Sequence, residues 1–285
     1  MSDTSLILTL SCDARPGIIA AVTGTIADLG GNITESAQYW DRTTDRFFLR
    51  IAFLGPATVA PAELERALEP AVERFGMELQ VIDATRPPRI IIMVSKFDHA
   101  LLHLLYQIRA GWLHAEVAAI VSNHGDSRGI AEEAGLRFVH LPVTRDTKGE
   151  QEARLLELVE ETGAEAVILA RYMQVLSNDL AGRLSGRAIN IHHSFLPAFK
   201  GAKPYHQAHE RGVKLIGATA HYVTSDLDEG PIIEQDVERI SHRDTPDDLV
   251  RRGRDIERRV LARAVRHHLE DRIILNGKKT VVFTD

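Results

Sequence analysis

Several features are scarce or missing in this sequence, and each absence excludes a class of protein. A single cysteine, Cys12, rules out an internal disulfide framework and suits a reducing compartment. The formal net charge of -6 leaves no basic surplus to neutralise the phosphates of a nucleic acid. Apolar runs such as Ile90–Val94 are far shorter than the roughly 20 residues of a membrane span. No signal peptide is visible either, so we expect a cytoplasmic protein with no nucleic-acid or membrane partner.

Glycine-rich phosphate loops are also missing. The run Ile90–Val94 is typical of a strand, and the turn after it, Ser95–His99, contains no glycine. A Gly-x-Gly-x-x-Gly or Walker-type loop at that point would cradle phosphates with backbone amides. The sequence therefore disfavours nucleotide binding.

The N-terminal part of the chain predicts alternating strands and helices in the order β-α-β-β-α-β. This order is typical of a ferredoxin-like split βαβ domain. Two prolines in Arg86–Arg89 disfavour helix on both sides, so we place a boundary there, with domains over 1–85 and 86–285. The expected strands cover 5–11, 33–40, 46–53 and 77–82, and the expected helices cover 18–29 and 61–75.

From residue 89 onward, short Val- and Ile-rich runs alternate with helical stretches. Such runs suit a mostly parallel sheet covered on both faces, which predicts a doubly wound α/β domain. Sites in such sheets form at the carboxyl ends of the strands. The expected strands cover 90–94, 117–121, 138–142, 166–169, 188–191 and 217–223, with helices over 99–110, 127–134, 148–162 and 245–269 and a hairpin over 273–283.

Three side chains form the candidate catalytic site. Asn190 and His192 are two residues apart, so on a strand they leave the same face. Asp228 follows the apolar run 217–223 in a turn. An amide, an imidazole and a carboxylate without an evident Ser or Cys nucleophile suit direct attack of water or an amine on an acyl carbon.

Each of these residues has an ordinary structural interpretation when it is taken alone. A lone histidine often bonds to backbone, an aspartate before Glu229-Gly230 is a common turn residue, and an asparagine can cap a strand end.

A metal site is an alternative, because zinc accepts imidazole and carboxylate ligands. The spacing of HExxH is absent, however, and thirteen histidines make chance pairs common, so we expect no metal and no cofactor. The ligands of such a site would come from His192, His193, His206, His209, His221, Asp226 and Asp228.

The candidate site carries a specific family resemblance. Asn190-Ile-His192 with Ser194–Gly201, together with the segments 217–223 and 228–235, resembles the signature of folate-dependent formyltransferases. The resemblance covers about 89–239 and implies that Asn190, His192 and Asp228 are the catalytic trio. It also implies a folate pocket, in which backbone near Gln174, Val175 and Leu176 reads the pterin and a second wall is formed by Thr224, Ser225, Asp226 and Leu227.

The N-terminal domain indicates which family of formyltransferase-like proteins the chain resembles. Cys12–Ile18 and Gly30–Ile33 resemble an ACT domain. An ACT domain before a formyltransferase-like domain resembles the 10-formyltetrahydrofolate deformylases, which implies hydrolysis of 10-formyltetrahydrofolate to formate and tetrahydrofolate. The glycine-free turn Ser95–His99 departs from the loop that binds phosphorylated amines in glycinamide ribonucleotide transformylase, and the added C-terminal domain of methionyl-tRNA formyltransferase has no counterpart here.

The resemblance implies further roles that the residues leave open. Lys203, Tyr205 and His206 would close the space that a transferase gives to its acceptor, or would only shape a surface loop. The ACT domain implies a homo-oligomer with an amino-acid effector, glycine or methionine, or a role in oligomerisation alone. The effector would lie near the turns that contain Asp13, Pro16, Gly17, Gly30 and Asn32.

Two rival functions stay open: transfer of the formyl group to an unidentified amine, and a folate or amino-acid sensor without turnover. In the hydrolytic mechanism, Asn190 and His192 hold the oxyanion and Asp228 positions water and moves its proton. Burial beside the folate would raise the pKa of Asp228 toward neutrality, although the sequence leaves that value open.

Overall fold

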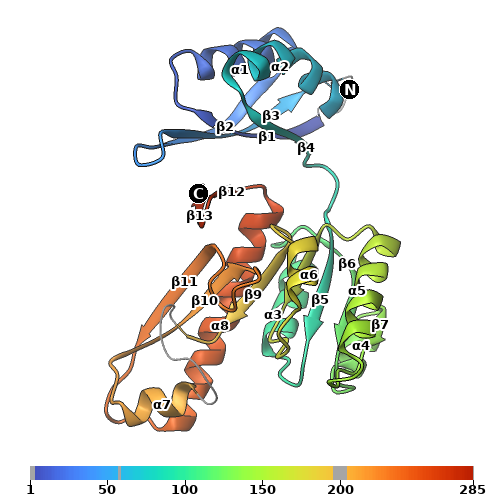
Figure 1. Cartoon of the computed structure of the whole chain (residues 1–285), viewed down its shortest axis with the longest axis vertical. Helices are drawn as coiled ribbons and strands as arrows, with labels where there is room; N and C mark the ends of the chain where they lie inside the picture. The colour runs from blue at the N-terminus through green and yellow to red at the C-terminus, as the bar shows by residue number, and fades with distance from the viewer. Residues whose placement is uncertain (1–3, 57–58, 195–203, 285) are drawn as a thin grey trace. The chain divides into compact units, whose positions relative to one another are not determined.

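The computed structural model describes residues 4–56, 59–194 and 204–284, which form two compact units. One unit comprises Met1–Pro87 with Glu270–Asp285, and the other comprises Pro88–Leu269 (Figure 1). No helix within the described ranges is long and apolar enough to cross a lipid bilayer.

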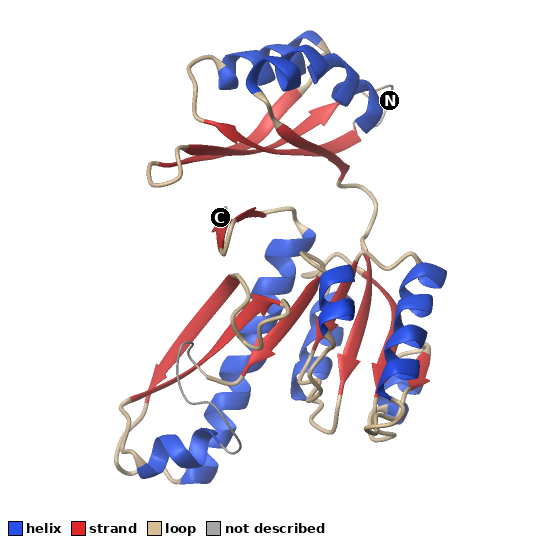
Figure 2. Cartoon of the chain, in the orientation of Figure 1, coloured by secondary structure: helices blue, strands red, loops and turns tan. Residues whose placement is uncertain are grey.

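The first unit is the predicted ferredoxin-like domain. Its sheet has the order β2-β3-β1-β4, and β1 pairs antiparallel with both β3 and β4. Both helices cover one face of this sheet, where leucines and isoleucines from every layer form the core (Figure 2). The elements are β1 (Thr4–Asp13), α1 (Ile18–Asp28), β2 (Asn32–Asp41), β3 (Arg46–Gly55), α2 (Pro61–Phe75) and β4 (Glu78–Asp83).

The C-terminal hairpin belongs to this first unit. The expected second domain over 86–285 is therefore too long, because the second unit ends at Leu269. The hairpin consists of β12 (Ile273–Asn276) and β13 (Lys279–Val282). Arg50 on β3 is 3% exposed and donates through Nη2 to the carbonyl oxygen of Glu270 at 2.9 Å. Glu35 on β2 pairs with Arg50 at 3.0 Å and with Arg272 at 2.8 Å. These contacts join residues more than 200 positions apart, which is why local patterns did not reveal them.

The second unit is built on a seven-stranded sheet with the order β11-β10-β9-β8-β5-β6-β7. The strands from β9 to β7 run parallel, and β10 and β11 form an antiparallel arm. The predicted mostly parallel α/β architecture is confirmed. The strands are β5 (Arg89–Val94), β6 (Glu116–Ser122), β7 (Phe138–His140), β8 (Ala166–Leu169), β9 (Ala188–His192), β10 (Leu215–Tyr222) and β11 (Ile232–Arg239).

Helices cover both faces of this sheet (Figure 2). They are α3 (His99–Arg109), α4 (Arg128–Glu133), α5 (Lys148–Thr162), α6 (Asn178–Arg183), α7 (Pro204–Glu210) and the long α8 (Pro246–Leu269). Strand β11 was not predicted, because acidic and basic side chains interrupt its alternation.

The register between β9 and β10 sets the site. Asn190 lies opposite His221, and His192 lies opposite Thr219. The parallel strands β8 and β9 end at the same edge of the sheet, so the loop that follows β8 lies beside the end of β9. Side chains from three separate segments therefore meet at this edge.

Arg50→Leu tests the assignment of the hairpin to the first unit. Removing this buried guanidinium takes away one of the two arginines that pair with Glu35 and the hydrogen bond to the carbonyl oxygen of Glu270, and we expect a loss on the order of 2 kcal/mol in the free energy of unfolding of this unit. Hydrogen exchange of 273–282 should accelerate strongly. Arg46→Leu, on the same strand but more exposed, is the control. Equal exchange in both variants would contradict the assignment.

Candidate active site

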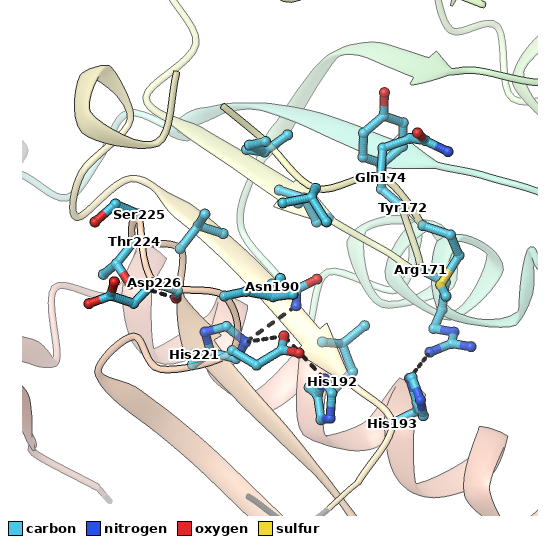
Figure 3. Close-up of a pocket in the computed structure, with 18 residues that line it drawn as sticks. Arg171, Tyr172, Gln174, Asn190, His192, His193, His221, Thr224, Ser225 and Asp226 are labelled. Atoms are coloured by element: carbon cyan, nitrogen blue, oxygen red, sulfur yellow. Dashed lines mark hydrogen bonds and ion pairs between the residues drawn. The ribbon is translucent and has the colours of Figure 1, made fainter. Parts of the chain in front are cut away.

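A cavity of about 310 Å³ opens at the carboxyl edge of β8 and β9. Its volume lies in the range of small-molecule sites. Figure 3 shows side chains from the loop after β8, from β9 and from the loop after β10 converging on it. The lining residues are Leu169, Arg171–Leu176, Asn190–His193, His221 and Val223–Asp228.

The structure brings all three predicted catalytic residues into this cavity. Nδ1 of His192 lies 3.2 Å from Oδ1 of Asp228. Asn190 lies two residues earlier on the same strand (Figure 3). The side chain of Asp228 reaches His192 from a turn, so the carboxylate and the imidazole face one another across two segments that are distant in sequence.

Asp228 is an ionised carboxylate in this site. The hydrogen bonds from His192 and then from His221 hold its pKa well below the usual value and outweigh the opposing effect of burial. A rise of this pKa through burial beside folate stays a prediction, because the protein side chains around Asp228 lower it. Its φ of 57° is left-handed, a conformation that aspartate tolerates better than most residues.

Hydrogen bonding also fixes the protonation of one ring atom of His192. Asp228 accepts, so Nδ1 of His192 carries a proton. Nε2 of the same ring is buried and has no hydrogen-bond partner among the described residues. A buried polar atom without a partner is uncommon and costly, which makes Nε2 the point where a reacting group would bind.

His221 is a member of the site that the sequence suggested only as a metal ligand. Its ring is buried, and Nδ1 donates to the carbonyl oxygen of Tyr222 at 2.9 Å. Nε2 lies 3.3 Å from Nδ2 of Asn190 and 3.7 Å from Oδ1 of Asp228. Strand register creates the contact with Asn190, and no sequence spacing signals it.

Gly230 holds the turn that carries Asp228 against β10. A Cβ atom at this position would lie 1.8 Å from the carbonyl oxygen of Tyr222. The amide of Tyr222 also donates to the carbonyl oxygen of Pro231 at 2.9 Å. Only glycine permits so close an approach of two backbones.

The predicted folate-pocket residues also line the cavity: Gln174, Val175, Leu176, Thr224, Ser225 and Asp226. Val175 and Leu227 are 54% and 60% exposed. Apolar side chains this exposed, from two different loops that line one cavity, suit contact with a flat apolar ring.

Of the predicted acceptor-closing residues, Tyr205 and His206 are not among the residues that line this cavity. Tyr205 on α7 is buried, and its hydroxyl donates to Oε1 of Glu257 at 2.7 Å. His206 lies next to it on the same helix and is half-buried. Lys203 lies outside the described residues.

The predicted effector residues lie in the first unit, at two places. Asp13, Pro16 and Gly17 precede α1, whereas Gly30 and Asn32 follow it. An eleven-residue helix separates the two turns by roughly 16 Å. One small amino acid therefore cannot contact both turns of a single copy.

A metal centre finds no support among the described side chains. No group of three or more His, Cys, Asp and Glu in those ranges has an arrangement that could hold a metal ion.

Known proteins resemble this chain in both of its parts. Residues 88–265 match the family model described as "Formyl transferase", and residues 4–82 match that of an ACT domain. A formyltetrahydrofolate deformylase from Corynebacterium sp. (strain P-1) is 50% identical over 277 residues, which cover 97% of either chain.

Solved structures give the same result. The crystal structure of formyltetrahydrofolate deformylase from Burkholderia mallei ATCC 23344 is 51% identical, with a TM-score of 0.94 over 99% of this chain and 100% of that one. Glycinamide ribonucleotide transformylase 1 from Symbiobacterium toebii is 33% identical with a TM-score of 0.64, and the match covers 70% of this chain and 95% of that one. The transferase thus lacks a counterpart for much of the chain, whereas the deformylases match it nearly end to end. The chain belongs to the formyltetrahydrofolate deformylase family.

Proposed function

We propose that this chain hydrolyses 10-formyltetrahydrofolate to formate and tetrahydrofolate. The observation that carries the proposal is the pairing of an ionised Asp228 with His192, whose Nε2 is buried and unpartnered among the described residues. A carboxylate base and a buried imidazole nitrogen without a partner among the described residues, in one cavity, suit addition of water to a formyl carbon.

The mechanism follows from these positions. Water attacks the formyl carbon while the Asp228 carboxylate accepts one of its protons. The side-chain amide of Asn190 and Nε2 of His192, when protonated, hold the developing oxyanion. The C–N bond then breaks, and the proton held by Asp228 passes to the departing nitrogen of tetrahydrofolate. The products are formate and tetrahydrofolate, and no covalent enzyme intermediate forms.

Metal-free catalysis and a cytoplasmic location are parts of this proposal. The acid-base groups named above perform every proton transfer without a metal. The single cysteine, Cys12, is buried and free, which suits a reducing compartment.

The purified protein with 10-formyltetrahydrofolate alone tests the proposed reaction. We expect formate and tetrahydrofolate in equal amounts without any amine, at a rate that a chelator does not change. Tetrahydrofolate absorbance and a formate assay measure the two products. Formate that appears only after an amine is added would instead favour a transferase, and folate binding without turnover would favour a sensor.

Asn190→Ala and Asp228→Asn test the assigned roles. Each variant should lower kcat by roughly 100- to 1000-fold, because each removes an interaction that strengthens in the transition state. Tetrahydrofolate affinity, measured by fluorescence titration, serves as the control and should stay within about threefold. Near-normal kcat in either variant would remove that residue from the mechanism.

The ACT domain supports a further proposal, which is that glycine or methionine binds to a homo-oligomer of this chain. A ligand that binds only the folded state raises the melting temperature as its concentration exceeds the dissociation constant. Thermal unfolding with glycine, methionine and alanine as the control measures this effect. An identical Tm with all three amino acids would leave oligomerisation as the domain's role.

A further inference from the structure

A buried ion pair between Glu257 and Arg171 has no part in the mechanism above. Glu257 on α8 is 1% exposed, and its Oε2 lies 3.2 Å from Nε of Arg171. Nε2 of His99 lies 2.9 Å from the same oxygen. The other carboxylate oxygen accepts from the hydroxyl of Tyr205. Burial alone would raise the pKa of Glu257, but the bonds from His99 and Tyr205 and the charge of Arg171 lower it, so the group is an anion.

Helix α8, which carries Glu257, has a glycine at the place where the ring of Tyr205 packs against it. A Cβ atom at Gly253, one turn earlier on α8, would lie 2.1 Å from Cζ of Tyr205. Any larger residue would displace the tyrosine ring from Glu257. The sequence therefore keeps a glycine inside a long helix, where glycine costs roughly 1 kcal/mol relative to alanine.

Arg171 is held in an unfavourable backbone conformation. It follows β8 with a φ of 65°, in the left-handed region that costs a non-glycine residue roughly 1–2 kcal/mol. Such strain persists where the surroundings determine the conformation, and it concentrates at functional sites. Here the guanidinium is only 11% exposed and lies between Glu257 and a histidine of the cavity.

That histidine is His193, and its contact with Arg171 fixes its tautomer. Nη1 of Arg171 lies 2.8 Å from Nδ1 of His193. A guanidinium only donates, so Nδ1 must accept and the ring proton is on Nε2. Burial, followed by the charges of Arg171 and His192, lowers the pKa of His193 to about 4 against the opposing effects of Glu257 and Asp228. The ring is neutral at physiological pH.

The neutral ring of His193 stacks on the catalytic ring of His192. Their centroids are 4.8 Å apart, and their planes differ by 22°. Figure 3 shows the contact of Arg171 with His193 as a dashed line. A neutral neighbour adds no repulsion when His192 carries a second proton, and a ring fixed by Arg171 restricts the plane of His192.

We propose that Arg171, held in place by its ion pair with Glu257, is a positioning residue. Its hydrogen bond to Nδ1 fixes the ring proton of His193 on Nε2, and His193 in turn holds Nε2 of His192 toward the formyl oxygen. The inference deepens the hydrolysis proposed above, and it assigns Arg171 a role separate from contact with folate. Arg171 acts through His193, so its removal should affect kcat more than KM.

Arg171→Gly is the direct test, because glycine also relieves the positive φ. We expect kcat to fall about 10- to 100-fold with KM for 10-formyltetrahydrofolate within about threefold. Guanidinium or methylguanidinium added to this variant should restore part of kcat by occupying the vacated space. Arg137→Gly, which removes an ion-paired arginine outside the cavity, should keep its kcat and show no response to guanidinium.

Nitrogen-15 NMR of His193 supplies a readout that a merely structural role would not change. In the unaltered protein, the signal should show an unprotonated Nδ1 and a titration midpoint near 4. In Arg171→Gly the midpoint should rise, because the charge of Arg171 is lost while burial and His192 still lower the pKa, so His193 becomes charged at a higher pH and kcat decreases as the pH falls through that midpoint. Arg171→Met, which keeps a long side chain but has neither a charge nor a donor, provides the same test if the glycine variant does not fold.

Double substitution separates this inference from the proposed reaction. In Arg171→Gly with His193→Phe, kcat should equal that of His193→Phe alone, because Arg171 acts only through that ring. Additive losses, an unchanged kcat in Arg171→Gly, or a wild-type His193 with protonated Nδ1 would each overturn the positioning role. Loss of formate release in the unaltered protein would instead overturn the reaction itself.

Discussion

The site depends on one carboxylate held between two imidazoles. Asp228 lies 3.2 Å from Nδ1 of His192 and 3.7 Å from Nε2 of His221, and these two imidazoles keep it ionised despite partial burial. The arrangement requires a β9-β10 register that places His221 opposite Asn190. It also requires a turn tight enough for Gly230 to touch the backbone of β10. A one-residue slip would turn these side chains to the other face of the sheet.

A second carboxylate, the buried Glu257, is linked to the same imidazole through other side chains. Asp228 bonds His192 directly, whereas Glu257 reaches it through Arg171 and His193. Nδ1 of His192 thus bonds to an anion that accepts protons, whereas the face of the ring stacks on the neutral ring of His193. Two carboxylates in different environments serve different purposes, because Asp228 borders the cavity and Glu257 is nearly sealed from solvent.

The sequence predicted the parts of the site that lie in continuous motifs. Asn190 and His192 share a strand, and Asp228 occupies a recognisable turn, so their types and spacing were enough. His221 and Glu257 depend on strand register and helix packing, which local patterns do not contain. The same limit explains the hairpin at 273–282, since its partners Glu35 and Arg50 lie more than 200 residues away. The ionisation of Asp228 depends on distances between segments, so composition could not give it.

Carbon-13 NMR of the Asp228 carboxyl carbon tests the central claim most directly. The signal is assigned by its absence from the spectrum of Asp228→Asn and is followed with pH in the unliganded protein. Two imidazole donors that hold the carboxylate ionised predict a chemical shift that stays constant from roughly pH 5 to 8, above the ordinary aspartate range. A titration of this carbon near neutrality would contradict the account, because Asp228 would then be protonated when it is required to accept a proton from water.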